Sequence, residues 1–277
     1  MRTQPQDVIA KLEADNSRLA KEKILLDAMN EGLDEFFEGL KMCLDKLYTF
    51  GVKQVPTKDE VVAGQGCPWN VFKDLAEKLS NRELTGHNAR DAINLVMSSA
   101  TAEQWNGFYR RILIKDLRCG VSEKTVNSVA KKNKFGKYMV PVFTCQLAHD
   151  SANHEKKLVG KKMLEVKLDG VRTLAIVHPD GKVDMLSRNG KEFTNFGHIQ
   201  DEISAVVKQD PPPYPLVLDG EVMSENFQDL MKQVHRKGSA DAKDAVLHLF
   251  DFIPLEEFKK GKWDKTQTLR TAMLKAW

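Results

Sequence analysis

The pattern of apolar residues changes about halfway along the chain, and this change limits the folds open to it. Over residues 6–48 apolar side chains recur every three or four positions, the spacing of a helix with one buried face. After about residue 140 this pattern gives way to short apolar runs separated by Pro, Gly, Asn and Asp, which are typical of strands joined by turns. The sequence therefore predicts a helical region followed by a region of mixed helix and strand.

The first region is expected to be entirely helical. The helical pattern over residues 6–48 has a break at 30–32. Four further helices are predicted at residues 69–80, 89–99 with Asn88 as cap, 102–117, and 123–131 with Ser122 as cap. The lysine-rich stretch 131–137 is interpreted as a linker, so the first domain is placed at residues 1–138.

The second region is expected to belong to the α+β class. Strands are predicted at residues 163–168, 171–177, 183–188, 216–222 and 245–253, and helices at 198–208 and 225–236. Asp180–Gly181 and Asn189–Gly190 favour tight hairpins, which join antiparallel strands. We therefore expect antiparallel sheets rather than repeated βαβ units in a second domain at residues 139–277.

Composition restricts the class of protein. The chain has 277 residues, of which 42% are hydrophobic, enough for two packed cores. No apolar stretch approaches the roughly 18–20 residues that a membrane helix needs, and the N-terminus lacks the apolar segment of a signal peptide. The four cysteines form no CxxC pair, so neither a zinc site nor a disulfide framework is indicated. Reduced thiols in the cytoplasm are expected.

Positive charge is concentrated towards the end of the first region. The net charge is only +3, but residues 110–137 hold 9 Lys and Arg against 2 Asp and Glu, an excess of seven. Such an excess suits contact with a phosphate backbone, although an ordinary solvated helix surface can have the same composition. The candidate phosphate contacts are Arg110, Arg111, Lys115, Arg118, Lys124, Lys131 and Lys132.

A lysine inside an apolar run is the first candidate for chemistry. Lys167 lies in the predicted strand 163–168 and is followed by Asp169–Gly170 and Arg172. A buried ammonium is costly, and a lysine whose pKa is lowered by burial or by a neighbouring cation can act as a covalent nucleophile. Arg172, one predicted turn away, is a candidate neighbour. The plainer alternative is a lysine at the rim of an ordinary β-turn.

Two later segments place carboxylates in apolar strands. Asp219–Gly220–Glu221 puts a carboxylate at the end of an apolar run, and Phe250–Asp251–Phe252 alternates aromatic side chains with an acid. Taken singly, the first is explained by a strand that ends in a turn. The second is explained by a core strand with inward-facing rings.

Taken in order, these motifs resemble those of the ATP-dependent DNA ligases of the T-even phage type, in the covalent nucleotidyltransferase superfamily that also contains mRNA-capping enzymes. The segments that carry the resemblance are Lys167–Arg172, Ser187–Gly190, Asp219–Glu221, Phe250–Phe252, Arg82–Ala89, Arg110–Ser122 and Cys145–Ala148. The helical first region favours a DNA ligase over an RNA ligase or a capping enzyme. A non-catalytic duplex-DNA-binding protein is the alternative from another class, because the basic cluster alone suffices for it.

The resemblance implies an enzyme that uses ATP and Mg²⁺ to seal nicks in DNA replication, repair and recombination. Lys167 would attack the α-phosphate of ATP, the AMP would pass to the 5′-phosphate of a nick, and the 3′-OH would displace it. The residues implied to hold ATP are Glu165 at the adenine edge, Arg172 and Arg188 at ribose or phosphate oxygens, Glu221 at the ribose or Mg²⁺, and Phe250 stacked on adenine.

The resemblance also sets expectations for the rest of the protein. Residues 1–138 would bind DNA, and residues 139–277 would form the N-terminal part of an adenylation domain. Two later motifs of the family and its OB-fold domain are not found, so the chain is interpreted as a fragment. The expected partner is nicked double-stranded DNA, with a sliding clamp as a further candidate and no membrane. We expect a monomer in the cytoplasm of a bacterial or phage-infected cell.

Overall fold

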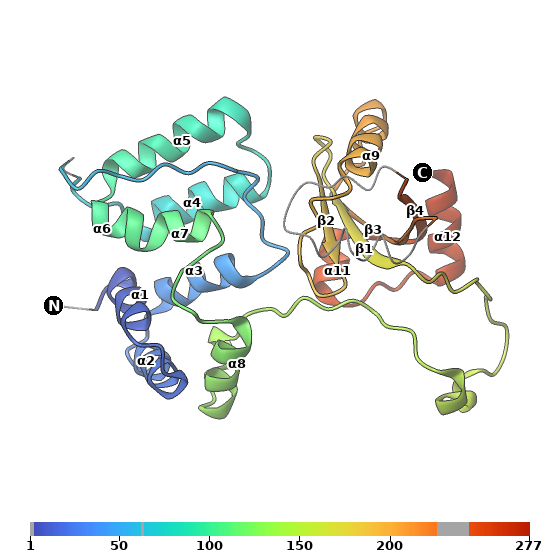
Figure 1. Cartoon of the computed structure of the whole chain (residues 1–277), viewed down its shortest axis with the longest axis horizontal. Helices are drawn as coiled ribbons and strands as arrows, with labels where there is room; N and C mark the ends of the chain where they lie inside the picture. Colours follow the sequence, from blue (N-terminus) through green and yellow to red (C-terminus); the bar gives the residue numbers. More distant parts are fainter. Residues whose placement is uncertain (1–2, 62–63, 226–243) are drawn as a thin grey trace. The chain divides into compact units, whose positions relative to one another are not determined.

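The computed structural model describes residues 3–61, 64–225 and 244–277 (Figure 1). These residues form two compact units, Met1–Phe143 and Thr144–Trp277, and each is described by itself. Within the described ranges, no helix is both long and apolar enough to cross a membrane.

The described part of the first unit is helical. Its α-helices are α1 (Pro5–Ala14), α2 (Arg18–Asn30), α3 (Asp34–Leu44), α4 (Trp69–Ser80), α5 (Gly86–Ser99), α6 (Ala102–Gln104), α7 (Arg110–Leu113) and α8 (Glu123–Lys132). A π-helical turn, Trp105–Tyr109, joins α6 to α7, and a 3₁₀ turn, Gly136–Tyr138, follows α8. Large side chains from α3, α4 and the π turn meet in the core; among them are Phe36, Phe37, Phe72, Trp105 and Phe108.

Most of the predicted helices of this unit are confirmed. The predicted break at 30–32 falls at the junction of α2 and α3, and α4 has the predicted bounds. Ser122 caps α8 as predicted, because its hydroxyl accepts a hydrogen bond from the Thr125 amide.

Three details of the helix predictions are wrong. The helical run predicted over 6–48 is also interrupted between α1 and α2, and it ends at Leu44. The cap predicted at Asn88 lies inside α5, which already begins at Gly86. The helix predicted over 102–117 contains the π turn and ends at Leu113. Lys115 adopts a left-handed φ of 58°, which diverts the chain from a helical path.

In the second unit, the described residues form an antiparallel sheet of four strands in the order β2-β1-β3-β4. Its elements are β1 (Val171–Val177), β2 (Val183–Ser187), α9 (Gly197–Gln209), β3 (Leu216–Met223), β4 (Val246–Pro254), α11 (Leu255–Lys260) and α12 (Gln267–Ala276), after 3₁₀ turns at Ser151–Asn153 and Glu155–Lys157. α9 packs against β1 and β2, and α12 packs against β4 (Figure 1). This arrangement agrees with the predicted α+β class.

One face of this sheet forms the core of the second unit. Successive side chains of a strand point to opposite faces, so alternate residues of β1 and β3 share the buried side. These strand residues meet an apolar stripe of α9, and the cluster includes Ala175, Val177, Leu216, Leu218, Ile199 and Val207.

The strand predicted at 163–168 is wrong. Residues 158–170 form neither helix nor strand, and most of them are exposed. A strand is held by ladder hydrogen bonds, and no described strand pairs with this segment. The helix predicted at 225–236 lies outside the described residues.

Candidate functional site

The second face of the sheet carries charged side chains. Arg172 in β1 lies opposite Glu221 in β3, and Asp219 in β3 lies opposite Asp251 in β4. Because residues two apart in a strand share a face, Asp219 and Glu221 lie on the same side as Arg172. Strand pairing therefore gathers one arginine and three acids from distant parts of the sequence.

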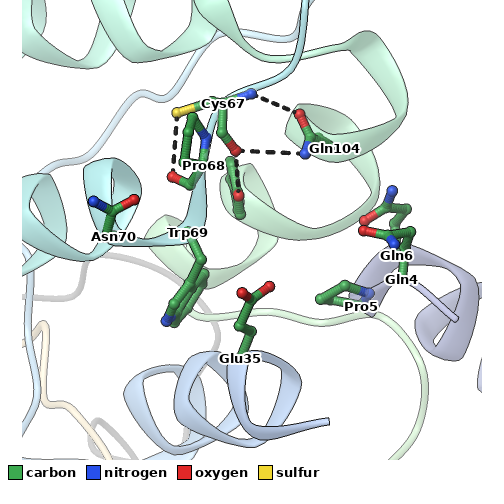
Figure 2. A pocket seen from close by; sticks show the side chains of 10 residues that line it. Gln4, Pro5, Gln6, Glu35, Cys67, Pro68, Trp69, Asn70 and Gln104 are labelled. Atoms are coloured by element: carbon green, nitrogen blue, oxygen red, sulfur yellow. Dashed lines mark hydrogen bonds between the residues drawn. The ribbon is translucent and has the colours of Figure 1, made fainter. Parts of the chain in front are cut away.

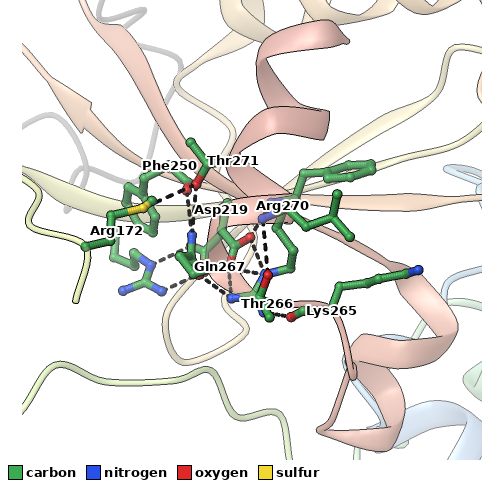
Figure 3. Close-up of polar contacts among 12 residues, drawn as sticks. Arg172, Asp219, Phe250, Lys265, Thr266, Gln267, Arg270 and Thr271 are labelled. Carbon is green, nitrogen blue, oxygen red and sulfur yellow. Dashed lines mark hydrogen bonds and ion pairs between the residues drawn. The ribbon is translucent and has the colours of Figure 1, made fainter. Parts of the chain in front are cut away.

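Arg172 and Asp219 form a bidentate ion pair (Figure 3). Arg172 Nε lies 2.5 Å from Asp219 Oδ1, and Arg172 Nη2 lies 2.6 Å from Oδ2. Burial raises the pKa of Asp219, the pairing with Arg172 opposes this rise, and the nearby Asp251 adds to it. A bidentate pair between a guanidinium and a carboxylate fixes the orientation of both groups, so the Arg172 guanidinium is held in one position.

A β-bulge places Phe250 beside Arg172. Asp219 pairs with Asp251, but the next residue of β3 pairs with Leu249, which leaves Phe250 as the extra residue of β4. The guanidinium carbon of Arg172 lies 4.8 Å from the centre of the Phe250 ring, a cation–π contact. The bulge thus directs an aromatic ring towards the charged group.

A pocket of about 540 Å³ opens beside Phe250. Glu165 and Phe250, the two residues predicted to contact adenine, both line it. Apolar lining comes from Met163, Leu164, Leu249, Leu274 and Trp277. Small-molecule sites usually have volumes of about 300–1,000 Å³ and mainly apolar walls with a few polar groups. The size and the lining of this pocket suit an aromatic base.

Lys167 is not among the residues that line this pocket. Its side chain is 76% exposed, and its Nζ is paired with the Asp169 carboxylate. The hydrogen bond to Asp169 raises the pKa of Lys167, and Glu221 makes a smaller contribution in the same direction. The amine is therefore within electrostatic reach of the charged face. Lys167 and Glu165 lie in the segment that was predicted as the strand 163–168 and is not a strand.

Two of the Asp-Gly pairs, Asp169–Gly170 and Asp219–Gly220, are places of close backbone approach rather than turns. A Cβ on Gly170 would lie 2.2 Å from the Val222 carbonyl oxygen, and a Cβ on Gly220 would lie 2.6 Å from that of His248. Gly220 lies inside β3, which continues beyond it. The tight turn predicted at 169–170 is therefore wrong, and the alternative of a strand that ends in a turn at 219–221 does not hold. Glycine is required because a neighbouring strand leaves no room for a side chain.

Glu221 and Arg188 lie near the same face. Glu221 Oε1 accepts a hydrogen bond from the Gly170 amide at 3.0 Å. Arg188 directly follows β2 and is exposed, and its carbonyl oxygen lies 3.7 Å from Cys145 Sγ. Burial raises the pKa of Cys145, while Arg172 and Arg188 act to lower it. The thiol is thus within electrostatic reach of both arginines predicted to bind ATP.

Arg270 is a residue of this cluster that the sequence did not indicate. It lies in α12, and its Nε and Nη2 donate to Asp251 Oδ1 and Oδ2 at 2.8 and 2.9 Å (Figure 3). An acid between two phenylalanines does signal a buried carboxylate, which requires a partner. The sequence cannot name that partner, because only tertiary packing brings α12 to β4.

The basic cluster of the first unit contains residues with internal roles. Lys115 Nζ donates to the carbonyl oxygens of Met42, Asp45 and Tyr48 at 2.6–2.7 Å. These carbonyls lie at and just beyond the end of α3, where the ammonium satisfies acceptors that the helix leaves open. Burial lowers the pKa of Lys115 to about 8.

The two arginines at the start of the cluster are also bound within the unit. Arg110 Nε donates to the Val55 carbonyl at 3.0 Å. Arg111 Nη1 donates to the Leu117 carbonyl at 2.9 Å and to a Glu13 carboxylate oxygen at 3.0 Å. The structure therefore uses Arg110 and Arg111 to hold neighbouring segments together.

The remaining members of the cluster are open to solvent. Arg118 is exposed and lies 3.6 Å from the Asp116 carboxylate. Lys124, Lys131 and Lys132 are exposed on α8, and none of them forms an ion pair with a described residue. We call these three the α8 lysines; they are the part of the cluster best placed to meet a polyanion.

A second pocket, of about 350 Å³, lies in the first unit (Figure 2). Its lining includes Glu35, Trp69, Gln104 and Tyr109. The Cys67 amide donates to Gln104 Oε1 at 2.9 Å, and the Tyr109 hydroxyl donates to the Cys67 carbonyl at 2.8 Å. None of the predicted site residues lines this pocket.

The three acidic side chains on the charged face of the sheet are already engaged. Asp219 and Asp251 are each bound by an arginine, and Glu221 is bound by a backbone amide. Over the ranges that the structure describes, no group of three or more His, Cys, Asp or Glu side chains is arranged to hold a metal ion. A cage made only of protein ligands is therefore not present there.

Comparison with known proteins relates the second unit to one family. The family model described as the ATP dependent DNA ligase domain matches residues 144–276. The DNA ligase of Enterobacteria phage T4 is 26% identical over 200 residues, which are 70% of this chain and 37% of that protein. The DNA ligase of Enterobacteria phage T6 is 26% identical over 151 residues, which are 52% of this chain and 30% of that protein.

A solved structure is also similar over almost the whole chain. The structure titled Pmar-Lig_Pre. is 61% identical, with a TM-score of 0.55, and the match covers 99% of this chain and 63% of that one. The chain thus spans about two fifths or less of the phage proteins and less than two thirds of the solved structure.

Proposed function

We propose that this chain belongs to the ATP-dependent DNA ligase family, whose domain model matches residues 144–276, and that it carries the nucleotide-binding and DNA-binding parts of an enzyme that seals nicks in duplex DNA. The main support for the proposal is the pocket beside β4. Glu165 and Phe250 line it, and an ion pair with Asp219 holds Arg172 over the Phe250 ring.

In the proposed reaction, Lys167 attacks the α-phosphate of ATP. A phosphorus–nitrogen bond forms, the bond to pyrophosphate breaks, and the amine loses its proton. AMP then passes to the 5′-phosphate of the nick, and the 3′-OH attacks that phosphate and releases AMP. Phosphoryl transfer of this kind depends mainly on positioning and on charge neutralisation.

The described geometry suits a division of roles among the site residues. Adenine occupies the pocket against Phe250, with its polar edge towards Glu165. Arg172 and Arg188 hold ribose or phosphate oxygens. Glu165 and Lys167 lie in the same segment, which is free of ladder hydrogen bonds. Contact between Glu165 and the bound base therefore brings the amine towards the phosphates, which lowers the entropic barrier to attack.

Magnesium is proposed to reach the site together with the nucleotide. Mg²⁺ usually keeps several waters and is held by one or two carboxylates plus substrate phosphates. Glu221 is the carboxylate proposed here for that contact, or for the ribose. It lies on the charged face, and among the described residues its side chain accepts a hydrogen bond from the Gly170 amide alone. Such a site does not need a cluster of protein ligands.

The first unit is proposed to bind nicked double-stranded DNA without regard to sequence. Contacts to phosphates achieve this, and the α8 lysines are exposed for that role. Roles in DNA replication, repair and recombination, action as a monomer in a bacterial or phage-infected cytoplasm, and a sliding clamp as partner are proposed from the family alone.

The direct test is covalent labelling. The chain is incubated with Mg²⁺ and ATP labelled at its α-phosphate and is then run on a denaturing gel. We expect wild type to retain label and Lys167→Ala to lose it. Lys162→Ala, which removes an exposed lysine from the same segment, should label like wild type.

The same assay separates the alternatives. Label from GTP in place of ATP would indicate a capping-type nucleotidyltransferase. Binding to nicked DNA that Lys167→Ala leaves unchanged, without label from either nucleotide, would indicate the non-catalytic DNA-binding protein.

A further inference from the structure

Four charged side chains form a continuous row across the second unit. Arg172 in β1 binds Asp219 in β3, Asp219 lies opposite Asp251 in β4, and Asp251 binds Arg270 in α12 (Figure 3). Asp219 and Asp251 are 6% and 8% exposed. The row therefore contains two buried carboxylates side by side, with one arginine at each end.

The row is stable because each of the two adjacent carboxylates is paired with an arginine. Side chains directly opposite in an antiparallel pair lie about 5 Å apart at Cβ, where like charges repel. Asp251 contributes to raising the pKa of Asp219, which is the mark of this repulsion. If Arg270 were absent, Asp251 would be a buried charge without compensation. The two acids would then either compete for Arg172 or share a proton.

Arg270 is itself fixed at the start of α12. Its Nη1 donates to the Lys265 carbonyl at 2.8 Å, and its Nη2 is also bound to the Gln267 side chain. Gln267 Nε2 in turn donates to the Phe250 carbonyl at 3.4 Å. The first turn of α12 therefore contacts both the acid next to the bulge and the bulged residue.

We infer that Arg270 is a positioning residue of the nucleotide site: it neutralises Asp251, so that Asp219 remains free to hold Arg172 against the Phe250 ring. That the site binds a nucleotide rests on the proposed function, whereas the effect of Arg270 on the position of Arg172 does not. Arg270 does not line the pocket, and it acts on the nucleotide only through Asp251, Asp219 and Arg172.

The first test compares the KM for ATP and the kcat of AMP labelling in the full chain. Arg270→Gln should raise the KM roughly tenfold, as expected for coupling within one ion-pair network, with a smaller change in kcat. Adding Asp251→Asn to this variant should restore the KM, because the charge that needed compensation is gone. The control is Lys262→Gln, which breaks an exposed ion pair with Asp264 and should change neither constant.

A second measurement reports the ion pair between Arg172 and Asp219 in the absence of any nucleotide. The ¹⁵N signal of the Arg172 Nε–H group, assigned by its loss in Arg172→Lys, reports the ion pair with Asp219. Arg270→Gln should shift this signal and speed the exchange of its proton, and Asp251→Asn should reverse both effects. If the signal responds in this way but wild type takes up no AMP, the positioning of Arg172 is supported and the proposed function fails.

Two results would overturn the inference. One is an Arg270→Gln variant that has both the wild-type KM and an unchanged Arg172 signal. The other is a raised KM for ATP in the single variant Asp251→Asn, which can be measured even if Arg270→Gln does not fold. With no charge to neutralise at that position, its KM should match wild type, and a roughly tenfold rise would mean that Asp251 itself is required.

Discussion

A lysine hydrogen-bonded to a carboxylate is a poor nucleophile until it loses its proton. Asp169 raises the pKa of Lys167 by this hydrogen bond, so the ammonium form predominates at neutral pH. Only the free amine can attack phosphorus, and its fraction grows as the pH approaches that pKa.

The initial rate of AMP transfer at saturating ATP is therefore expected to rise with pH over about pH 7–9, below the ordinary lysine pKa. Lys162→Ala should follow the same profile as wild type. A rate that stays flat or falls over this range would show that loss of the Lys167 proton does not limit the step.

Lys115 offers a residue-scale test of stability. Its folded-state pKa is lowered to about 8, whereas an unfolded lysine titrates near 10.4. Between these values the unfolded chain binds more protons than the folded chain, so this group makes the unfolding free energy rise with pH. The rise is at most about 1.4 kcal/mol per pH unit.

Urea unfolding of wild type and Lys115→Met, at several pH values between about 7 and 10, measures this effect. The stability of wild type relative to the variant should increase across that window. A difference that does not vary with pH would mean that the three carbonyl acceptors hold the ammonium charged throughout.

At the scale of elements, the bulge in the β3–β4 pair sets the position of Phe250. A Cβ on Gly220 would press against the His248 backbone in β4. Gly220→Ala should therefore destabilise the second unit by about 1–3 kcal/mol and weaken ATP binding, because β4 must shift.

The matched control is Gly197→Ala in α9, where an added Cβ meets no atom within 4 Å. Thermal unfolding and ATP titration of both variants provide the comparison. Equal stability of the two variants would contradict the account of the bulge.

The strands themselves were predictable, because alternation and turn residues are local signals. β1 has its predicted bounds, β2 and β3 differ from theirs by one residue at one end, and β4 is shifted by one residue at both ends. What sequence reasoning could not supply is register. The contact between Arg172 and Asp219 depends on how β1 and β3 align, and the direction of Phe250 depends on one extra residue in β4. The alternation at 163–168 was misleading because strand formation also needs a partner.

At the scale of the whole molecule, fewer residues of the basic cluster are available for DNA contact than the sequence suggests. Arg110, Arg111 and Lys115 are engaged by backbone carbonyls. Of the seven candidate phosphate contacts, the α8 lysines therefore remain as the exposed cations without an ion-pair partner among the described residues. Sequence shows where charge is concentrated, but the direction of each side chain depends on packing.

Replacing the three α8 lysines with glutamine should weaken binding to nicked duplex DNA. It should also lower the slope of log affinity against log salt by about 0.9 for each phosphate that the protein no longer neutralises. The control replaces Lys73 and Lys78 of α4, which pair with Glu38 and Asp74. Fluorescence anisotropy at several salt concentrations measures both, and an equally large decrease in affinity for the two variants would contradict a specific role for α8.

The central claim is that one amine, Lys167, takes AMP from ATP. The most direct measurement is peptide mapping by mass spectrometry after incubation of the chain with ATP and Mg²⁺. We expect a mass increase of one AMP on the peptide that contains Lys167, with fragment ions that place it on that side chain, and no increase in Lys167→Ala. An AMP adduct on a different residue, or an adduct that persists in Lys167→Ala, would contradict it.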